Sequence, residues 1–295
     1  MNGKAQAPGC RHRAIRRRVI AVAAIAALLL GTAGILTVRG DWRYRVLYCL
    51  TPVRLPELSV AEMPDRVETR TRGEWLADMR VTANDALRLI NPTHPLADGY
   101  QPELVSLDGW EMTAQTRAAF EALCVRVLES TGEQLLIRSA YRNFGEQQDE
   151  LDAAGETIAA RPGESEHEAG LGLDICVKGF GGMAFLKTDA GRLVNRTCAE
   201  EGFIIRYPLS KQAVTGFGFE PWHLRYVGIP HARVMSECHL TLEEYLELLT
   251  PGCWFAVGDY RILRTSEESV TLPSSFTCCT VSPDGCGFWI YSVLV

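Results

Sequence analysis

The chain has 295 residues, of which 47% are hydrophobic and 22% are charged. These proportions are typical of globular proteins and exclude a largely disordered chain. The formal net charge is −6, but residues 1–38 contain no Asp or Glu, so residues 39–295 carry 24 basic and 36 acidic residues, a net charge of −12. An acidic body argues against a nucleic-acid partner, because nucleic-acid binding normally needs a basic face.

The first predicted element is a membrane-spanning helix over residues 19–38, a run of twenty residues without a charge. Such a run is long enough to cross the hydrocarbon core of a bilayer. Basic side chains precede it, which predicts a cytoplasmic basic tail over residues 1–18 and a body outside the membrane. A cleaved signal peptide is the alternative. An uncleaved anchor is favoured, because the apolar run is long and no clear small-residue cleavage site follows it closely.

The cysteines fit an exported body, since nine of the ten lie beyond residue 38. Nine is an odd number, so at least one thiol is unpaired or bonds another chain. Cys286 could form a disulfide with Cys278 or Cys279 and so close a C-terminal hairpin. The sequence contains no Cys-x-x-Cys pair, so a thiolate zinc site has no support.

Residues 39–83 are rich in Pro, Arg and Glu and are interpreted as a polar stem. The body is placed at residues 84–249, with helices over 113–130, 145–160, 189–201 and 240–249 and strands over 87–90, 134–138, 171–177 and 203–208. In the first helix the apolar residues recur every three or four positions. Residues 250–295 are predicted to form a β-rich extension of short hairpins. Helices and strands do not alternate regularly, which indicates an α+β fold.

Two short runs carry the chemistry. The first, SEHEAGLGLD at positions 165–174, contains His167 and Asp174. In the strand predicted over 171–177, the apolar residues at 171, 173 and 175 share one face, so Asp174 points to the opposite face, toward a cleft. Gly170 lets the backbone turn and brings His167 toward Asp174.

The second run, EPWH at positions 220–223, contains Glu220 and His223. Pro221 argues against a helix interior or a central strand, so the run is placed at the start of a strand. A hydrolytic zinc site needs three protein ligands, an open coordination position and a base beside it. The two runs together provide two imidazoles, one carboxylate and a spare glutamate. Each run alone is weakly specific.

Together the runs resemble the VanY-type D-alanyl-D-alanine carboxypeptidases of the M15 family of zinc peptidases. The pattern of that family is Ser-x-His-x-x-Gly-x-x-x-Asp followed by Glu-x-x-His, and both halves match. The resemblance extends to the segment from Ser139 to Arg142 with Gln147, and it covers residues 84–249. It implies a small antiparallel sheet with flanking helices, the Hedgehog/D,D-peptidase-like zinc fold.

By position, the resemblance implies that His167, Asp174 and His223 bind Zn²⁺ and that Glu220 is the catalytic base. It also implies Arg142 as the cation beside the scissile group. A guanidinium can bind a terminal carboxylate, and it can also stabilise the oxyanion of a tetrahedral intermediate. The sequence does not distinguish these two roles.

Three further residues near the motifs are weaker candidates. Ser165 and Gln147 could donate hydrogen bonds to the substrate, and the alternatives are a turn cap for Ser165 and a helix surface residue for Gln147. Arg138 is interpreted as a solvent-facing strand residue.

The predicted function is a zinc metallopeptidase, independent of serine, that removes the terminal D-alanine from peptidoglycan stem pentapeptides ending in D-Ala-D-Ala. The predicted anchor places it at the cell membrane, with the catalytic domain outside. In some family members this trimming removes the target of glycopeptide antibiotics. The alternatives are an L,D-carboxypeptidase or a D,D-dipeptidase of the same fold. A zinc-stabilised wall-binding module without catalysis is less favoured, because such modules tend to lack the base that Glu220 provides.

Overall fold

A computed structural model describes residues 40–53, 59–60, 66–155 and 159–295. The basic tail predicted at residues 1–18 and the anchor predicted at 19–38 lie outside these ranges. Among the helices that are described, none has the length and apolar character needed to cross a bilayer. Helix α2 (Gly40–Leu50) belongs to one compact unit, and residues Thr51–Val295 form a second unit, which contains the predicted site.

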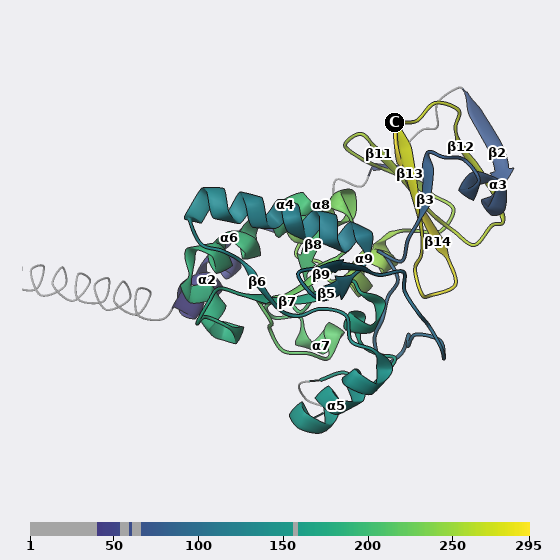
Figure 1. The fold of residues 1–295 in the computed structure, drawn as a ribbon. Coiled ribbons are helices and arrows are strands. Elements are labelled where there is room, and N and C mark those ends of the chain that lie inside the picture. The colour runs from purple at the N-terminus through teal and green to yellow at the C-terminus, as the bar shows by residue number, and fades with distance from the viewer. Residues whose placement is uncertain (1–39, 54–58, 61–65, 156–158) are drawn as a thin grey trace, which may run out of the picture. The chain divides into compact units, whose positions relative to one another are not determined.

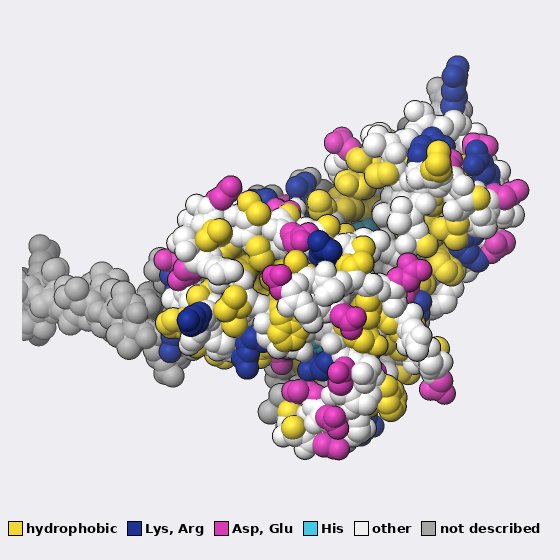
Figure 2. All heavy atoms as spheres, in the orientation of Figure 1, with side chains coloured by type: hydrophobic (Ala, Val, Ile, Leu, Met, Phe, Trp, Pro, Cys, Tyr) yellow, Lys and Arg dark blue, Asp and Glu magenta, His cyan; other side chains and the backbone are white. Residues whose placement is uncertain are grey.

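The second unit combines helices with mainly antiparallel sheets, which confirms the predicted α+β class (Figure 1). Its α-helices are α3 (Arg72–Leu76), α4 (Ala114–Thr131), α5 (Phe144–Ala154), α6 (Asp189–Thr197), α7 (Gln212–Thr215), α8 (Ile229–Glu237) and α9 (Leu242–Leu248). Three short 3-10 helices accompany them: η1 (Glu166–Ala169), η2 (Gly182–Lys187) and η3 (Cys198–Glu201). Acidic and basic side chains are interspersed over the face drawn in Figure 2.

A four-stranded antiparallel sheet supports the site. Its strand order is β6 (Leu136–Ser139), β7 (Gly172–Cys176), β9 (His223–Tyr226) and β8 (Phe203–Ile205). The side chains of Leu173, Ile175 and Leu224 are fully buried in a core that they share with α4 and α6. Because side chains alternate along a strand, Asp174 and His223 point to the other face. The direction predicted for Asp174 is therefore confirmed.

Helix α4 covers the apolar face of this sheet. It begins after Thr113, whose side chain accepts a hydrogen bond from the backbone N–H of Thr116, and it ends at Gly132 in the left-handed conformation (φ 73°). Phe120 and Leu123 lie on its buried face. The N-cap and the glycine at the C-terminus are the expected signals for these two ends, and the predicted helix over 113–130 is confirmed.

The C-terminal strands build a second sheet, of order β1-β10-β11-β14-β13-β3. Its members are β1 (Ser59–Val60), β10 (Trp254–Val257), β11 (Tyr260–Thr265), β14 (Trp289–Leu294), β13 (Cys278–Pro283) and β3 (Val81–Ala83). Phe255, Ile262 and Ile290 from this sheet share one buried cluster with Val227 and Tyr245. The C-terminal extension therefore packs directly on the body at residues 84–249. Two-stranded sheets pair β4 (Val105–Leu107) with β5 (Trp110–Met112), and β2 (Val67–Thr71) with β12 (Ser269–Pro273).

Residues 67–83 differ from the polar stem predicted over 39–83. Strand β2 pairs with β12, and β3 pairs with β13 in the parallel direction. Trp75 between them has no exposed surface, and its indole N–H donates to the carbonyl of Val270 at 2.8 Å. These partners are almost two hundred residues away in the chain, so local periodicity carried no sign of the pairing.

The strand predicted over 87–90 is also absent from the structure, where this segment is irregular. Its backbone is satisfied by the C-terminal extension instead. The N–H of Leu87 donates to the hydroxyl of Ser282 at 3.0 Å, and the N–H of Leu89 donates to the carbonyl of Asp284 at 2.9 Å.

Candidate functional site

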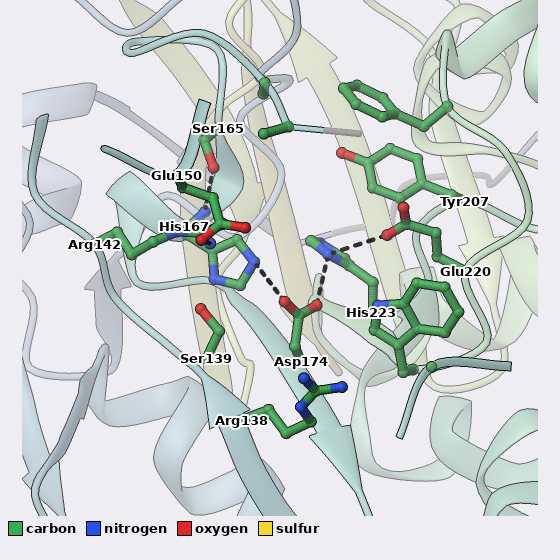
Figure 3. A pocket seen from close by; sticks show the side chains of 15 residues that line it. Arg138, Ser139, Arg142, Glu150, Ser165, His167, Asp174, Tyr207, Glu220 and His223 are labelled. Atoms are coloured by element: carbon green, nitrogen blue, oxygen red, sulfur yellow. Dashed lines mark hydrogen bonds and ion pairs between the residues drawn. The ribbon is translucent and has the colours of Figure 1, made fainter. Parts of the chain in front are cut away.

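A cleft of about 360 Å³ borders the polar face of the four-stranded sheet (Figure 3). It brings together most of the residues that the sequence singled out, from β6, η1, β7 and the start of β9. The predicted site residues in its lining are Arg142, Ser165, His167, Asp174, Glu220 and His223.

The sheet register places two of the predicted metal ligands side by side, because Asp174 of β7 pairs directly with His223 of β9. The third, His167, lies in η1, which Gly170 ends in the left-handed conformation (φ 64°). A Cβ atom at position 170 would lie 2.7 Å from Leu104 Cδ2. A glycine is therefore needed for the turn that returns η1 to β7.

The three side chains offer ligand atoms that all lie within 4.8 Å of one another. Oδ2 of Asp174 is 3.6 Å from Nε2 of His167, and Oδ1 is 3.1 Å from Nδ1 of His223. Oδ1 is buried, yet it makes no well-directed hydrogen bond. Buried polar atoms without partners are rare in native proteins, and a cation held between these atoms would satisfy them. Two imidazoles and a carboxylate are a zinc donor set.

Backbone contacts fix the orientation of the first histidine. Nδ1 of His167 lies 2.6 Å from the carbonyl oxygen of Ala140. A carbonyl only accepts, so Nδ1 carries the proton and the lone pair of Nε2 points toward Asp174. Burial lowers the pKa of His167 to about 3, so this imidazole is neutral at physiological pH, the state required of a metal ligand.

The other two ligands are strongly coupled. Burial raises the pKa of Asp174, but the electrostatic interaction with His167 and the contact with His223 outweigh burial and lower this pKa to about 2. Burial lowers the pKa of His223, but contacts with Asp174 and Glu166 raise it to about 9. The negative groups around His223 thus favour a positive charge at this point, which a proton or a metal ion can supply.

Glu220 lies beside the ligands but is not one of the clustered ligand groups. Its side chain is 18% exposed, and Oε2 is 3.9 Å from Nδ1 of His223. Burial raises the pKa of Glu220 to about 7, with the charge of His223 opposing and that of Asp174 adding to the effect. A carboxylate with a pKa near neutrality can both accept and return a proton.

Arg142 lines the cleft on the opposite side of the ligands from Glu220 in the view of Figure 3. Its Nε is buried and has no hydrogen-bond partner in the described structure, and Nη1 is 3.7 Å from a carboxylate oxygen of Glu150. A guanidinium with unused donors, placed in a cleft, can bind a carboxylate or an oxyanion.

Ser165 and Gln147, the two weaker candidates for substrate contacts, differ in their position relative to the cleft. Ser165 lines the cleft, and its hydroxyl also accepts from the backbone N–H of His167 as the cap of η1. Gln147 is fully buried and does not line the cleft. Its side-chain amide donates to the carbonyl of Ala160 at 2.7 Å. The side chain of Gln147 therefore joins α5 to the segment at residue 160, and a contact between Gln147 and a substrate stays a prediction.

Sequence reasoning did not place Arg138 or Tyr207 in the cleft, although both line it. Strand β6 has an irregular register between Ile137 and Ser139, so simple alternation could not orient Arg138. Tyr207 packs its ring 4.9 Å from that of His223. The predicted strand over 203–208 included Tyr207, whereas β8 ends at Ile205, so the prediction gave no direction for this side chain.

Comparisons with known proteins agree with this site. The profile of VanY, D-alanyl-D-alanine carboxypeptidase, matches residues 110–229, which include the three ligands, Glu220 and Arg142. Putative carboxypeptidase YodJ of Bacillus subtilis (strain 168) is 38% identical over 182 residues, which cover 55% of this chain and 67% of that protein. The bifunctional D-Ala-D-Ala dipeptidase and D-Ala-D-Ala carboxypeptidase VanXYC of Enterococcus gallinarum is 33% identical over 183 residues, 56% of this chain and 95% of that protein.

Two solved structures have similar sequences and folds. VanYB in complex with D-alanine-D-alanine is 32% identical, with a TM-score of 0.51 over 56% of this chain and 99% of that chain. The LdcB LD-carboxypeptidase is 34% identical, with a TM-score of 0.50 over 54% of this chain and 84% of that chain. The first is described as a complex with D-alanine-D-alanine and the second as an LD-carboxypeptidase, and their sequence identities to this chain are close.

Proposed function

Because the chain belongs to the VanY family of D-alanyl-D-alanine carboxypeptidases, we propose that it removes the terminal D-alanine from peptidoglycan stem pentapeptides. The observation that carries the proposal is one cleft that holds a cluster of three ligand groups, a carboxylate with a raised pKa and a cation. Metal-assisted hydrolysis of a C-terminal peptide bond can use these three elements together, as a metal site, a proton acceptor and a cation for the negative charge.

The metal in this proposal is Zn²⁺, held by His167, Asp174 and His223. Zinc in hydrolases is commonly bound by three protein side chains, with one position open. When bound, the ion acts as a Lewis acid that polarises a carbonyl and makes water a stronger acid. The chelating atoms are already gathered within 4.8 Å, so little rearrangement of the protein is needed.

The residues of the chain then have distinct tasks. Glu220 accepts a proton from the attacking water and returns it to the nitrogen of the departing D-alanine. The bond between the carbonyl carbon and this nitrogen then breaks with a neutral amine, and not an anion, as the leaving group. Arg142 binds the terminal carboxylate of the substrate, or the oxyanion that forms on the carbonyl oxygen. Asp174 and the two histidines keep the reacting groups on one face of the sheet.

A substrate panel tests the proposal. The purified chain is incubated with stem pentapeptide, stem tetrapeptide and free D-Ala-D-Ala, and the products are identified by mass spectrometry. The D,D-carboxypeptidase should shorten only the pentapeptide, by one D-alanine, and a chelator should stop the reaction. Shortening of the tetrapeptide would instead establish L,D-carboxypeptidase activity, and cleavage of the free dipeptide would establish D,D-dipeptidase activity. A zinc-loaded chain that cleaves none of them would favour a binding module.

We also propose that the protein is anchored by residues 19–38 with its cleft outside the cytoplasmic membrane. The support is the uncharged run and the basic residues before it. Stem peptides of peptidoglycan lie on that side, so the placement brings the cleft to its substrate. Protease treatment of intact protoplasts should remove the catalytic unit while leaving a short membrane-bound fragment, and full protection of the chain would contradict this topology.

A further inference from the structure

Glu166, the residue before the ligand His167, lies directly behind the other histidine ligand. It is 1% exposed. Its Oε1 accepts two charged hydrogen bonds, from Nε of Arg206 and Nη1 of Arg225, each at 2.6 Å. Its Oε2 is buried without a hydrogen-bond partner in the described structure, and it lies 3.7 Å from Nε2 of His223.

Like Oε2 of Glu166, the Nε2 atom of His223 is buried and lacks a hydrogen-bond partner within the described residues. One atom is a carboxylate oxygen and can only accept, and the other is a ring nitrogen that can donate when it carries a proton. The other ring nitrogen, Nδ1, faces Asp174 at 3.1 Å. A proton on Nε2 would direct a donor at the carboxylate oxygen 3.7 Å away and leave the lone pair of Nδ1 for a metal ion.

We propose that Glu166 is a positioning residue that holds His223 in the tautomer with Nδ1 free to bind the metal. Metal-binding histidines commonly donate their second ring nitrogen to a carboxylate or a carbonyl, which fixes the ring and makes it a stronger ligand. His167 uses the carbonyl of Ala140 for this purpose. Glu166 provides the same support to His223 with a full negative charge.

The arginines explain how a carboxylate can serve here while buried. Arg206 also binds Glu243 through two hydrogen bonds of 2.9 and 2.6 Å, and Arg225 donates to the carbonyls of Ala86 and Arg88. Two carboxylates and two guanidinium groups give a neutral buried cluster. Both cations bind the same oxygen, Oε1, so the second oxygen stays available to His223.

Glu166→Gln is the informative substitution, because glutamine has the shape of glutamate but places a hydrogen-bond donor, in place of an acceptor, beside Nε2 of His223. The arginines can only donate, so they select the amide oxygen as their partner. The amide NH₂ then faces Nε2 of His223. An NH₂ group cannot accept a hydrogen bond, so it favours the tautomer with the proton on Nδ1, where the metal should bind. Loss of such a supporting contact typically weakens metal affinity by about 10–100-fold.

The test is a zinc titration of the purified full chain against a competing chromogenic chelator. Glu166→Gln is expected to weaken zinc binding by about 10–100-fold. Glu243→Gln is the matched control, since it removes the same charge from the same cluster and also deprives Arg206 of a partner. Among the described residues, the ion pairs of His223 are with Glu166, Asp174 and Glu220 and not with Glu243. The control should keep near wild-type affinity. An unchanged affinity in Glu166→Gln, or equal losses in the two variants, would overturn the inference.

A second measurement needs no substitution at Glu166. In the zinc-bound wild-type chain labelled with ¹⁵N-histidine, Nε2 of His223 should carry a slowly exchanging proton in long-range ¹H–¹⁵N spectra. An unprotonated Nε2 would refute the proposal even if the variant does not fold. The inference rests on the metal binding proposed above but not on the bond that is cut. Failure of the wild-type chain to bind zinc would refute the proposed function itself.

Discussion

His231 offers a quantitative test of how the C-terminal sheet joins the catalytic unit. Its Nδ1 contacts the hydroxyl of Tyr245 in α9 at 2.7 Å, and its Nε2 contacts the hydroxyl of Ser292 in β14 at 2.8 Å. Burial lowers the pKa of His231 from 6.5 to about 3. The folded protein therefore keeps this imidazole neutral in a pH range where the unfolded chain protonates it.

The difference between the pKa of His231 in the folded and unfolded states determines how stability changes with pH. Above pH 6.5 neither state binds the proton, and the contribution of His231 to stability is fully present. As the pH falls from 6.5 toward 3, the unfolded state gains a proton that the folded state excludes, and stability is lost. Between about pH 7 and pH 5 the loss from this one group is about 2 kcal/mol.

Equilibrium denaturation of the metal-free chain at about pH 7 and pH 5 measures the loss, with His231→Gln as the comparison. The glutamine variant should be less stable at neutral pH, because a buried pair of hydroxyls loses a well-placed partner. Its further loss on acidification should be smaller than that of wild type by about 2 kcal/mol. Equal losses in the two proteins would show that His231 is not held neutral, and the reasoning would fail.

Three substitutions in the cleft give further expectations. Glu220→Gln should lower kcat by about 10²–10⁴-fold with the zinc content unchanged, as checked by metal analysis, and retained turnover would exclude Glu220 as the base. His167→Ala should abolish stoichiometric zinc binding, whereas His94→Ala, outside the cleft, should keep it. Arg142→Gln should lower kcat/KM for the pentapeptide by about 10²–10³-fold with zinc retained. A higher KM with unchanged kcat would indicate that Arg142 binds the carboxylate, and a lower kcat would indicate that it stabilises the oxyanion.

The alternation of apolar residues in the sequence was sufficient to predict the direction of the Asp174 side chain. The apolar residues at 171, 173 and 175 repeat with the period of a strand, and the structure buries Leu173 and Ile175 completely. The pairing of Asp174 with His223 could not be predicted in this way, since sheet register depends on two segments about fifty residues apart. The family motif supplied that connection.

Gln147 has a structural contact that its position in the motif did not predict. A polar residue on a predicted helix beside the site suggested a substrate contact, but its amide turns inward to a backbone carbonyl. Glu166 shows the opposite case. A glutamate between Ser165 and His167 would be expected at the surface, and its burial depends on the contacts with Arg206, directly after β8, and Arg225 of β9.

The same cluster explains why the C-terminal extension belongs to the catalytic unit. Arg225 holds Glu166 with one nitrogen and the carbonyls of Ala86 and Arg88 with another. The segment that carries those carbonyls is in turn held by the extension, through the N–H of Leu89 and the carbonyl of Asp284. A continuous series of hydrogen bonds therefore runs from the turn at Asp284 to the carboxylate behind the metal site. The extension thus helps to hold the backbone that orients Arg225, and it is more than a packing appendage.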